Sequence, residues 1–231
     1  DEFNRDMETL LYSIPVDLFL PCGGRPETLD RSNWSRMLDP HGRPSTKVIV
    51  EGANSFISPE ARLELQRHGV VILRDASANN CGVISSSYEI IANLLMTEKE
   101  YLNHKEAYVG DVLAILEKRA GEEAGLIFER HRMQEPAKAQ PYTEISVAIS
   151  MEINACYAQL FDFFQENPDL ADQPLFRKVM LSHLPAMVRS EQRFRNRLKQ
   201  LPPKIKFAIL ASEISTRMIY HGGWELDFEK R

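Results

Sequence analysis

The sequence predicts an α/β protein in which a parallel sheet is followed by an all-helical region. In the first hundred residues, three short apolar runs are separated by segments that carry helix signals. Such an alternation is typical of a parallel sheet with right-handed crossovers. From about residue 97 onward, apolar residues recur at helical spacing. We therefore expect two domains, residues 1–96 and residues 97–231.

The predicted strands are the three apolar runs. Each is about strand length, rich in β-branched or aliphatic residues, and continuous rather than alternating. Continuous runs of this kind are typical of strands buried on both faces of a sheet. The runs are VDLFL (16–20), KVIVEGA (47–53) and VVILRD (70–75).

Helix signals lie between these strands. Ser58 offers a capping hydroxyl, and Pro59 suits the first position of a helix. The apolar repeat that follows is expected to end at Gly69, a natural residue for a helix C-terminus. Between the first two strands, TLDRSNWSRML (28–38) predicts a short helix and DPHGRPS (39–45) predicts a turn.

The chain after the third strand is predicted to be helical. SSSYEIIANLLM (85–96) forms the first helix, and the capping box from Thr97 to Glu100 opens the next. A linker is expected at QEPAKAQPY (134–142). Three glycines in the second helix are expected to be weak points: Gly110, Gly121 and Gly125.

A long amphipathic helix is predicted after the linker, because apolar side chains fall on one helical face without an interrupting Gly or Pro. Further helices are expected within residues 174–184, 188–201 and 205–222. The apolar face consists of Ile145, Ile149, Ile153, Cys156, Tyr157, Leu160, Phe161 and Phe164.

Composition narrows the classes of function. The net charge of −5 argues against nucleic acid as the main partner, because phosphate binding requires a surplus of Lys and Arg. Three distant cysteines give no disulfide framework, and the histidines and cysteines lack metal-ligand spacing. No apolar stretch approaches the roughly 20 residues that span a bilayer, and the acidic N-terminus lacks signal-peptide features. We therefore expect a cytoplasmic protein without membrane or metal partners.

The residues that follow the three strands are small. The strands leave into PCGGRP (21–26), EGANSF (51–56) and DASANNCGV (75–83). Ligands of an open parallel sheet bind at the carboxyl ends of the strands. Small residues there let the backbone approach a flat ring, and Asn can both donate to and accept from a carboxamide. One such exit would be an ordinary turn, whereas three on one sheet edge indicate a binding site.

The same segments resemble those of a known family. VEGAN (50–54) and ANNCGVISS (78–86) are similar to the C-terminal half of the nucleotide domain of the glutamate dehydrogenases. The resemblance is closest to the large NAD-dependent branch, in which the first exit reads PxGGRP, as residues 21–26 do here. It implies that residues 1–96 are the C-terminal half of a Rossmann-like, NAD-binding sheet. It also implies oxidative deamination of L-glutamate to 2-oxoglutarate and ammonia, with hydride transfer to NAD.

The resemblance also implies what individual residues do. The first exit would border the adenosine and ribose of NAD, the second would meet the nicotinamide, and the third would lie beside the nicotinamide and the reacting carbon of the substrate. Ser86, which we expect at the start of a helix, would donate to a substrate carboxylate, because a helix N-terminus attracts anions. The implied cofactor-binding residues are Pro21, Cys22, Gly23, Gly52, Ala53, Asn54, Asn79 and Gly82, and the implied substrate-binding residues are Val83 and Ser86.

Two departures from the family pattern bear on activity. Cys81 stands where the family usually has a second glycine, so its side chain either narrows the cofactor face or turns away from it. No G-x-G-x-x-G fingerprint occurs, and the family's catalytic Lys and Asp lie in an earlier domain. We therefore assign no catalytic residue and expect a C-terminal fragment that is inactive alone. Its expected partners are the remainder of a longer polypeptide and further copies of the chain in a homo-oligomer.

Two alternative functions stay open. A leucine, valine or phenylalanine dehydrogenase would share the small strand exits, although PxGGRP and the long helical tail favour the glutamate enzyme. The other alternative is a non-catalytic regulatory or interaction module on a degraded nucleotide fold.

The segment from Arg177 to Lys206 also has two interpretations. It holds nine basic residues and one acid, Glu191. The segment is either a surface for an anionic partner or a helix face whose basic residues meet acids elsewhere. The second interpretation is favoured because Phe194 is the one aromatic residue interleaved with these basic residues and because the overall charge is negative.

Overall fold

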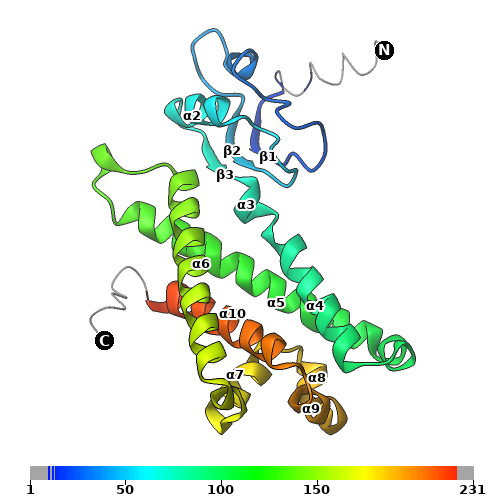
Figure 1. Cartoon of the computed structure of the whole chain (residues 1–231). Coiled ribbons are helices and arrows are strands. Elements are labelled where there is room, and N and C mark those ends of the chain that lie inside the picture. Colours follow the sequence, from blue (N-terminus) through cyan, green and yellow to red (C-terminus); the bar gives the residue numbers. More distant parts are fainter. Residues whose placement is uncertain (1–9, 11, 13, 223–231) are drawn as a thin grey trace. The chain divides into compact units, whose positions relative to one another are not determined.

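A computed structural model describes residues 10, 12 and 14–222 (Figure 1). The chain forms two compact units, each of which combines two stretches of the sequence. They are the sheet unit, residues 1–80 and 127–146, and the helical unit, residues 81–126 and 147–231.

The sheet unit contains three parallel strands in the order β1-β2-β3 (Figure 1). Val48 of the central strand lies opposite Leu18 on one side and Val71 on the other. The prediction that the three apolar runs form one parallel sheet is confirmed. The strands are β1 (Val16–Phe19), β2 (Thr46–Val50) and β3 (Val71–Leu73).

The connections between the strands follow the predicted helix signals. Helix α2 (Pro59–Arg67) begins after Ser58, whose hydroxyl accepts a hydrogen bond of 3.3 Å from the backbone N–H of Ala61. Gly69 follows the helix with a φ of +87°, a conformation that favours glycine. The short helix predicted before β2 is a 3₁₀ turn, Trp34–Met37. All of these predictions are confirmed.

Burial in the sheet unit is uneven. Ile49 of β2, Ile72 of β3 and Leu65 of α2 are fully buried in one cluster. In contrast, Val16 and Leu18 of β1 are 40% and 49% exposed. The prediction of burial on both faces is therefore wrong for β1, because Phe19 is the one residue of this strand that packs against the apolar cluster of the unit.

Long helices build the helical unit (Figure 1). Helix α5 runs for 35 residues without a break at Gly110, Gly121 or Gly125. The surrounding Ala, Leu, Glu, Lys and Arg residues favour the helix, and each glycine costs only about 1 kcal/mol. No helix in the described part of the chain is long and apolar enough to cross a membrane. The helices are α4 (Asn80–Leu95), α5 (Glu98–Arg132), α6 (Tyr142–Glu166), α7 (Pro174–His183), α8 (Ala186–Ser190), α9 (Gln192–Lys199) and α10 (Pro203–Gly222).

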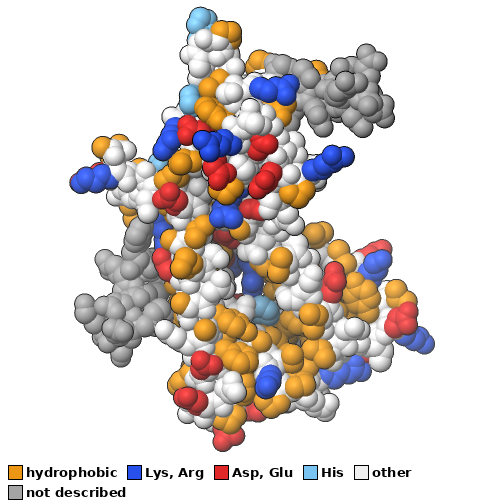
Figure 2. Space-filling view, turned by 45° about the horizontal axis from the view of Figure 1, so that its top comes forward, with side chains coloured by type: hydrophobic (Ala, Val, Ile, Leu, Met, Phe, Trp, Pro, Cys, Tyr) orange, Lys and Arg blue, Asp and Glu red, His pale blue; other side chains and the backbone are white. Residues whose placement is uncertain are grey.

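The core of the helical unit draws on most of these helices. Tyr88 of α4, Phe164 of α6, Phe194 of α9 and Leu210 of α10 are at most 1% exposed. The predicted apolar face of α6 is buried or half-buried along its length, as expected. Hydrophobic side chains also gather on the surface of this unit, in the lower part of Figure 2.

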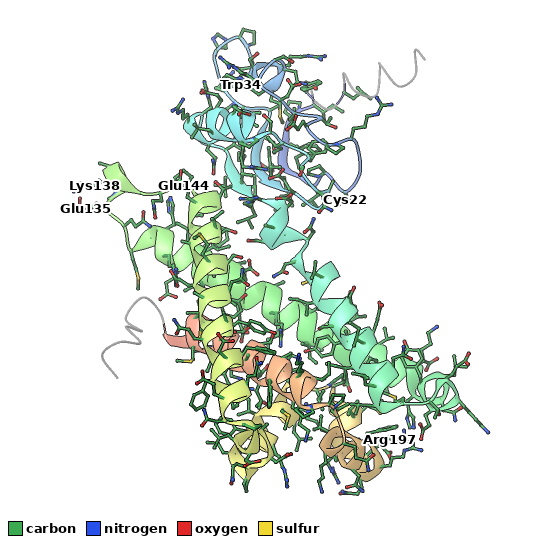
Figure 3. All side chains as sticks on the ribbon, in the orientation of Figure 1. Cys22, Trp34, Glu135, Lys138, Glu144 and Arg197 are labelled. Atoms are coloured by element: carbon green, nitrogen blue, oxygen red, sulfur yellow. The ribbon has the colours of Figure 1, made fainter. Side chains whose placement is uncertain are left out.

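Four of the nine basic residues between Arg177 and Lys206 form ion pairs among the described residues: Arg177, Arg193, Arg197 and Lys206. Arg197 (Figure 3) donates to Glu100 at 2.6 Å and to the carbonyl of Leu95 at 2.7 Å. Glu100 also closes the predicted capping box with Thr97, through reciprocal bonds of 2.9 and 3.3 Å. The hydrogen bond from Arg197 and those from Thr97 lower the pKa of Glu100 to about 2. These contacts support the interpretation of a helix face that meets acids of the same chain.

The two units divide the chain differently from the predicted boundary at residues 96 and 97. Helix α4 belongs to the helical unit because Tyr88, Ile91 and Leu95 lie in its core. Residues 127–146 return to the sheet unit. That residues 1–96 and 97–231 form two separate domains stays a prediction.

Candidate functional site

The first and second strand exits lie in direct contact. The backbone N–H of Ala53 donates to the carbonyl of Pro21 at 2.7 Å. A side chain at Gly52 would meet the sulfur of Cys22 at 3.1 Å and the Pro21 oxygen at 3.3 Å. The lack of a side chain at residue 52 therefore lets the second exit pack closely against the first. Cys22 lies in the exposed loop after β1 (Figure 3).

The glycines of the first exit differ from one another. Gly23 is exposed, and a side chain there would meet nothing within 4 Å. Gly24 has a φ of +121°, and a side chain there would meet the ring of Phe56 at 3.0 Å. Close approach of the backbone thus requires glycine at position 24, whereas position 23 tolerates a side chain.

A buried ion pair shapes the second exit. Glu51 is fully buried, and its carboxylate accepts from the Arg62 guanidinium at 3.0 Å and from the backbone N–H of Ile57 at 3.0 Å. Arg62 also donates to the carbonyl of Ile57 at 2.9 Å. The pair therefore fixes both ends of the loop that carries Gly52, Ala53 and Asn54. Sequence reasoning missed this function of Glu51, although an acid directly after a buried strand is an unusual residue to bury.

Asp75 joins the second exit to the third. Its carboxylate accepts from the backbone N–H of Ser55 at 2.9 Å and from that of Ala76 at 2.8 Å. Burial opposes ionisation of Asp75, but these hydrogen bonds and the nearby Arg74 outweigh it, and the pKa of Asp75 is lowered. The bond also supports Ser55, which has a φ of +53°. A non-glycine residue in this region is strained unless its surroundings hold it.

Two asparagines meet at this edge of the sheet. The side-chain amide of Asn79 donates to the side-chain oxygen of Asn54 at 2.5 Å and approaches the carbonyl of Gly52 at 3.4 Å. Asn54 is exposed and Asn79 is half-buried. The amide nitrogen of Asn54 and the oxygen of Asn79 have no hydrogen-bond partner among the described residues, so they remain available to a ligand. The prediction that the three exits converge at one sheet edge is confirmed.

The third exit is helical, which corrects the expectation of three small loops. Helix α3 (Asp75–Ala78) follows β3 at once, and α4 begins at Asn80. At the start of α3, the Asp75 carboxylate accepts from the backbone N–H of Ala76. Asn79, with a φ of −110° and a ψ of 5°, ends α3. The small residues Ala76, Ser77 and Ala78 bury little apolar area, but they are compatible with a helical backbone.

Helix α4 carries the last three predicted residues, Gly82, Val83 and Ser86. The expectation that Ser86 starts a helix is wrong, because α4 begins six residues earlier, at Asn80. The Ser86 hydroxyl bonds to the carbonyl of Gly82 at 3.4 Å. Val83 is 73% exposed, and Ser86 is also exposed. Residues three apart in a helix share a face, so α4 presents Val83 and Ser86 together.

Cys81 turns toward the neighbouring helix. Its sulfur lies 3.6 Å from the carbonyl oxygen of Leu116 in α5, and the side chain is half-buried. Burial raises the pKa of the Cys81 thiol. These observations favour packing over reactivity. Of the two possibilities for this side chain, the structure supports the one in which it packs into the helical unit.

The geometry of the sheet unit is that of a Rossmann-like α/β protein. Parallel strands end at one edge, where exposed Gly and Asn residues present main chain and amide groups. The sequence model of the glutamate/leucine/phenylalanine/valine dehydrogenases matches residues 2–123, which is more than half of the chain. The chain belongs to this family.

Individual relatives agree with the family match. The chain is 33% identical over 219 residues to glutamate dehydrogenase 2 of Dictyostelium discoideum, and 31% identical over 217 residues to a probable NAD-specific glutamate dehydrogenase of Schizosaccharomyces pombe. The aligned regions cover 90% and 89% of this chain but only 20% and 19% of those relatives. The chain therefore spans about a fifth of their length. No solved structure matches the chain.

Proposed function

We propose that this chain is part of an NAD-dependent glutamate dehydrogenase, in which it supplies one side of the nicotinamide site. The main support for this proposal is that the three strand exits converge, so that the side-chain amide of Asn79 donates to the side-chain oxygen of Asn54 at 2.5 Å. Relatives whose names specify NAD and glutamate support the cofactor and the substrate. The reaction would be oxidative deamination of L-glutamate to 2-oxoglutarate and ammonia.

The sheet edge fits the nicotinamide end of NAD. The free amide nitrogen of Asn54 can donate to a carboxamide oxygen, and the free oxygen of Asn79 can accept from a carboxamide N–H. Exposed Gly52 leaves the main chain open beside a flat ring. Pro21, Cys22 and Gly23 would border the ribose side, and Ala53 would support the loop through its bond to Pro21. NAD supplies the hydride acceptor of this chemistry.

The substrate side of the proposal rests on α4. Val83 would contact the carbon chain of glutamate, and Gly82 would let the backbone of α4 approach the cofactor. Ser86 would donate its hydroxyl to a substrate carboxylate, which requires that the hydroxyl exchange its 3.4 Å contact with Gly82 for the ligand. Such an exchange is feasible because both residues are exposed.

The substrate could also be another amino acid, since the family includes leucine, phenylalanine and valine dehydrogenases. The names of the relatives and the PxGGRP exit favour glutamate. The chain alone would not turn over substrate, because no residue in the site described above is placed to move a proton from the amino acid. An assay of the 231-residue chain with glutamate and NAD is expected to yield no NADH, and steady turnover would contradict this part of the proposal.

The nicotinamide site can be tested by NMR titration of the 231-residue chain with NADH. We expect the backbone amide signals of Gly52, Ala53, Asn54 and Asn79 to shift at concentrations up to about 10 mM, which would saturate a site of millimolar affinity. Asn54→Ala should weaken binding about tenfold, as expected for the loss of one hydrogen bond worth about 1.4 kcal/mol.

Asn103→Ala is the matched control, because Asn103 is exposed on α5, outside the sheet unit. It should leave the NADH titration unchanged. Signals that do not move, or equal affinities for Asn54→Ala and the parent chain, would contradict the proposed site.

A further inference from the structure

A polar cavity of about 310 Å³ lies within the helical unit, apart from every residue assigned to the nicotinamide site. Its wall is formed by side chains of α5, α7 and α10. The charged and titratable residues that matter here are Lys118, Arg119, Glu122, His183, Glu213 and Arg217.

Glu213 is the centre of this cluster, and its carboxylate is fully engaged. One oxygen accepts from His183 Nδ1 at 2.9 Å and from Arg119 at 3.2 Å, and the other accepts from Arg217 Nε at 2.7 Å. Burial opposes ionisation of Glu213, but the hydrogen bond from His183 and the charges of Arg217 and Arg119 outweigh it, and the pKa of Glu213 is lowered. Glu213 is therefore an acceptor whose sites are already occupied.

These contacts determine which nitrogen of His183 carries the proton. Nδ1 lies 2.9 Å from the Glu213 carboxylate, which only accepts, and 3.2 Å from Arg119 Nη2, which only donates. The carboxylate is nearer, and Arg119 Nη2 already donates to it, so we assign the proton to Nδ1 and the lone pair to Nε2. The ring is held in place by stacking on Tyr88, with centroids 5.4 Å apart, and its side chain is 5% exposed. Nε2 has no hydrogen-bond partner among residues 14–222. Burial outweighs the effect of Glu213 and lowers the pKa of His183, so the ring is neutral at neutral pH.

The wall also carries an excess of positive charge. Lys118, Arg119 and Arg217 are cations, whereas Glu122 and Glu213 are the carboxylates in the cavity wall. Arg119 donates to Glu213 through Nη2, which leaves its Nε and Nη1 groups without a hydrogen-bond partner in the described part of the chain. The cavity wall thus includes a guanidinium with unused donors, an imidazole with an unused acceptor, and Lys118, whose ammonium lies 3.6 Å from Glu122.

We propose that this cavity binds hydrogen phosphate, with Arg119 and Lys118 donating to its anionic oxygens and His183 Nε2 accepting from its O–H group. The ligand must satisfy two requirements: it must carry negative charge for Arg119 and Lys118, and it must have a proton to donate to His183 Nε2. A carboxylate or sulfate is fully deprotonated at neutral pH and has no proton to donate to Nε2. Phosphate keeps an O–H even as a dianion, so it alone among these small anions matches both the donors and the acceptor.

The test is a calorimetric and NMR titration of the 231-residue chain with inorganic phosphate, and with sulfate at the same ionic strength. Above neutral pH we expect phosphate to bind with a millimolar-order dissociation constant, about tenfold more tightly than sulfate. The side-chain Nε2 signal of His183 should move on addition of phosphate. Equal affinity for both anions, or no binding of phosphate, would overturn the proposal.

The pH dependence separates the proposed geometry from simple charge attraction. Tyr88, Arg119, Glu213 and Arg217 surround His183, and none of them gives Nε2 a proton. Below the pKa of His183 the ring carries a proton on both nitrogens, so sulfate can then accept from Nε2. Sulfate affinity should therefore approach that of phosphate as the pH falls, and a constant ratio of affinities would contradict the inference.

Lys118→Gln is the test variant, because the Lys118 side chain is 72% exposed and its loss leaves the buried cluster intact. It should weaken phosphate binding about tenfold, as expected for one charge-assisted hydrogen bond. Lys178→Gln makes the same charge change at an exposed position of α7, outside the cavity, and should have no effect. Equal affinities of the two variants would overturn the assignment of Lys118.

Discussion

The sheet unit and the helical unit use buried polar groups in opposite ways. In the sheet unit, Glu51 and Arg62 bond to each other and also to the main chain of Ile57. In the helical unit, the partners of Glu213 among the described residues are all side chains, those of His183, Arg119 and Arg217. Buried charges in the sheet unit thus fix the shape of loops, whereas those in the helical unit fix the orientation of side chains around a cavity. The first arrangement preorganises a main-chain surface, and the second leaves an imidazole nitrogen and guanidinium donors available.

The largest expected effect comes from breaking the buried pair in the sheet unit. Glu51→Ala leaves the Arg62 guanidinium uncompensated and should lower the free energy of unfolding by about 3–5 kcal/mol. Denaturation in urea measures this loss. The control is Glu64→Ala on α2, the helix that also carries Arg62. It removes a partner of the exposed Arg67 and should cost less than about 1 kcal/mol. Similar losses for the two variants would show that the buried pair has no special structural function.

The corresponding change in the helical unit should have a smaller effect. Glu213→Ala removes the acceptor of His183 and Arg119 and should cost about 2–3 kcal/mol, as expected for hydrogen bonds to a charged group. The loss is smaller than for Glu51 because Arg217 is 52% exposed and can turn to water. Glu117→Ala, at an exposed position of α5, is the control. A larger loss than for Glu51→Ala would reverse the proposed contrast.

The pH dependence of stability should come partly from His183. Its pKa is lowered by burial, so the unfolded chain binds a proton more readily than the folded chain does. The free energy of unfolding should therefore fall as the pH drops below the unfolded pKa of about 6.5, by at most about 1.4 kcal/mol per pH unit for this one group.

Urea denaturation at several pH values measures this slope. His183→Gln should reduce it, whereas His41→Gln, at an exposed position of the turn before β2, should not. An unchanged slope in His183→Gln would show that His183 is not the titrating group.

Helix caps should have the smallest effect, and it should be the same in both units. Ser58→Ala removes the cap of α2, and Thr97→Ala removes the capping box of α5. Each should cost about 1 kcal/mol in the free energy of unfolding. Clearly unequal costs would contradict this expectation and would indicate that the two units also differ in their local helix signals.

The local elements could be predicted because the information lies within a few residues. The cap at Ser58, the positive φ at Gly69 and the capping box at Thr97 each depend on neighbours three or four positions away. The errors arose where distant contacts decided the outcome. The exposure of β1 depends on which distant residues pack against its faces, and the start of α4 depends on how Asp75 and Asn79 bond near the second exit.

The amino-acid sequence by itself determined the strands, the helix ends and the small residues at each strand exit, because periodicity and capping are properties of neighbouring residues. Only the tertiary structure decided that Asp75 supports Ser55, 20 positions away, and that Arg119 meets Glu213, 94 positions away. Side-chain contacts over such separations leave no periodic signal in the chain. The packing of helices and loops alone determines which buried donor finds which acceptor, and which one is left available for a ligand.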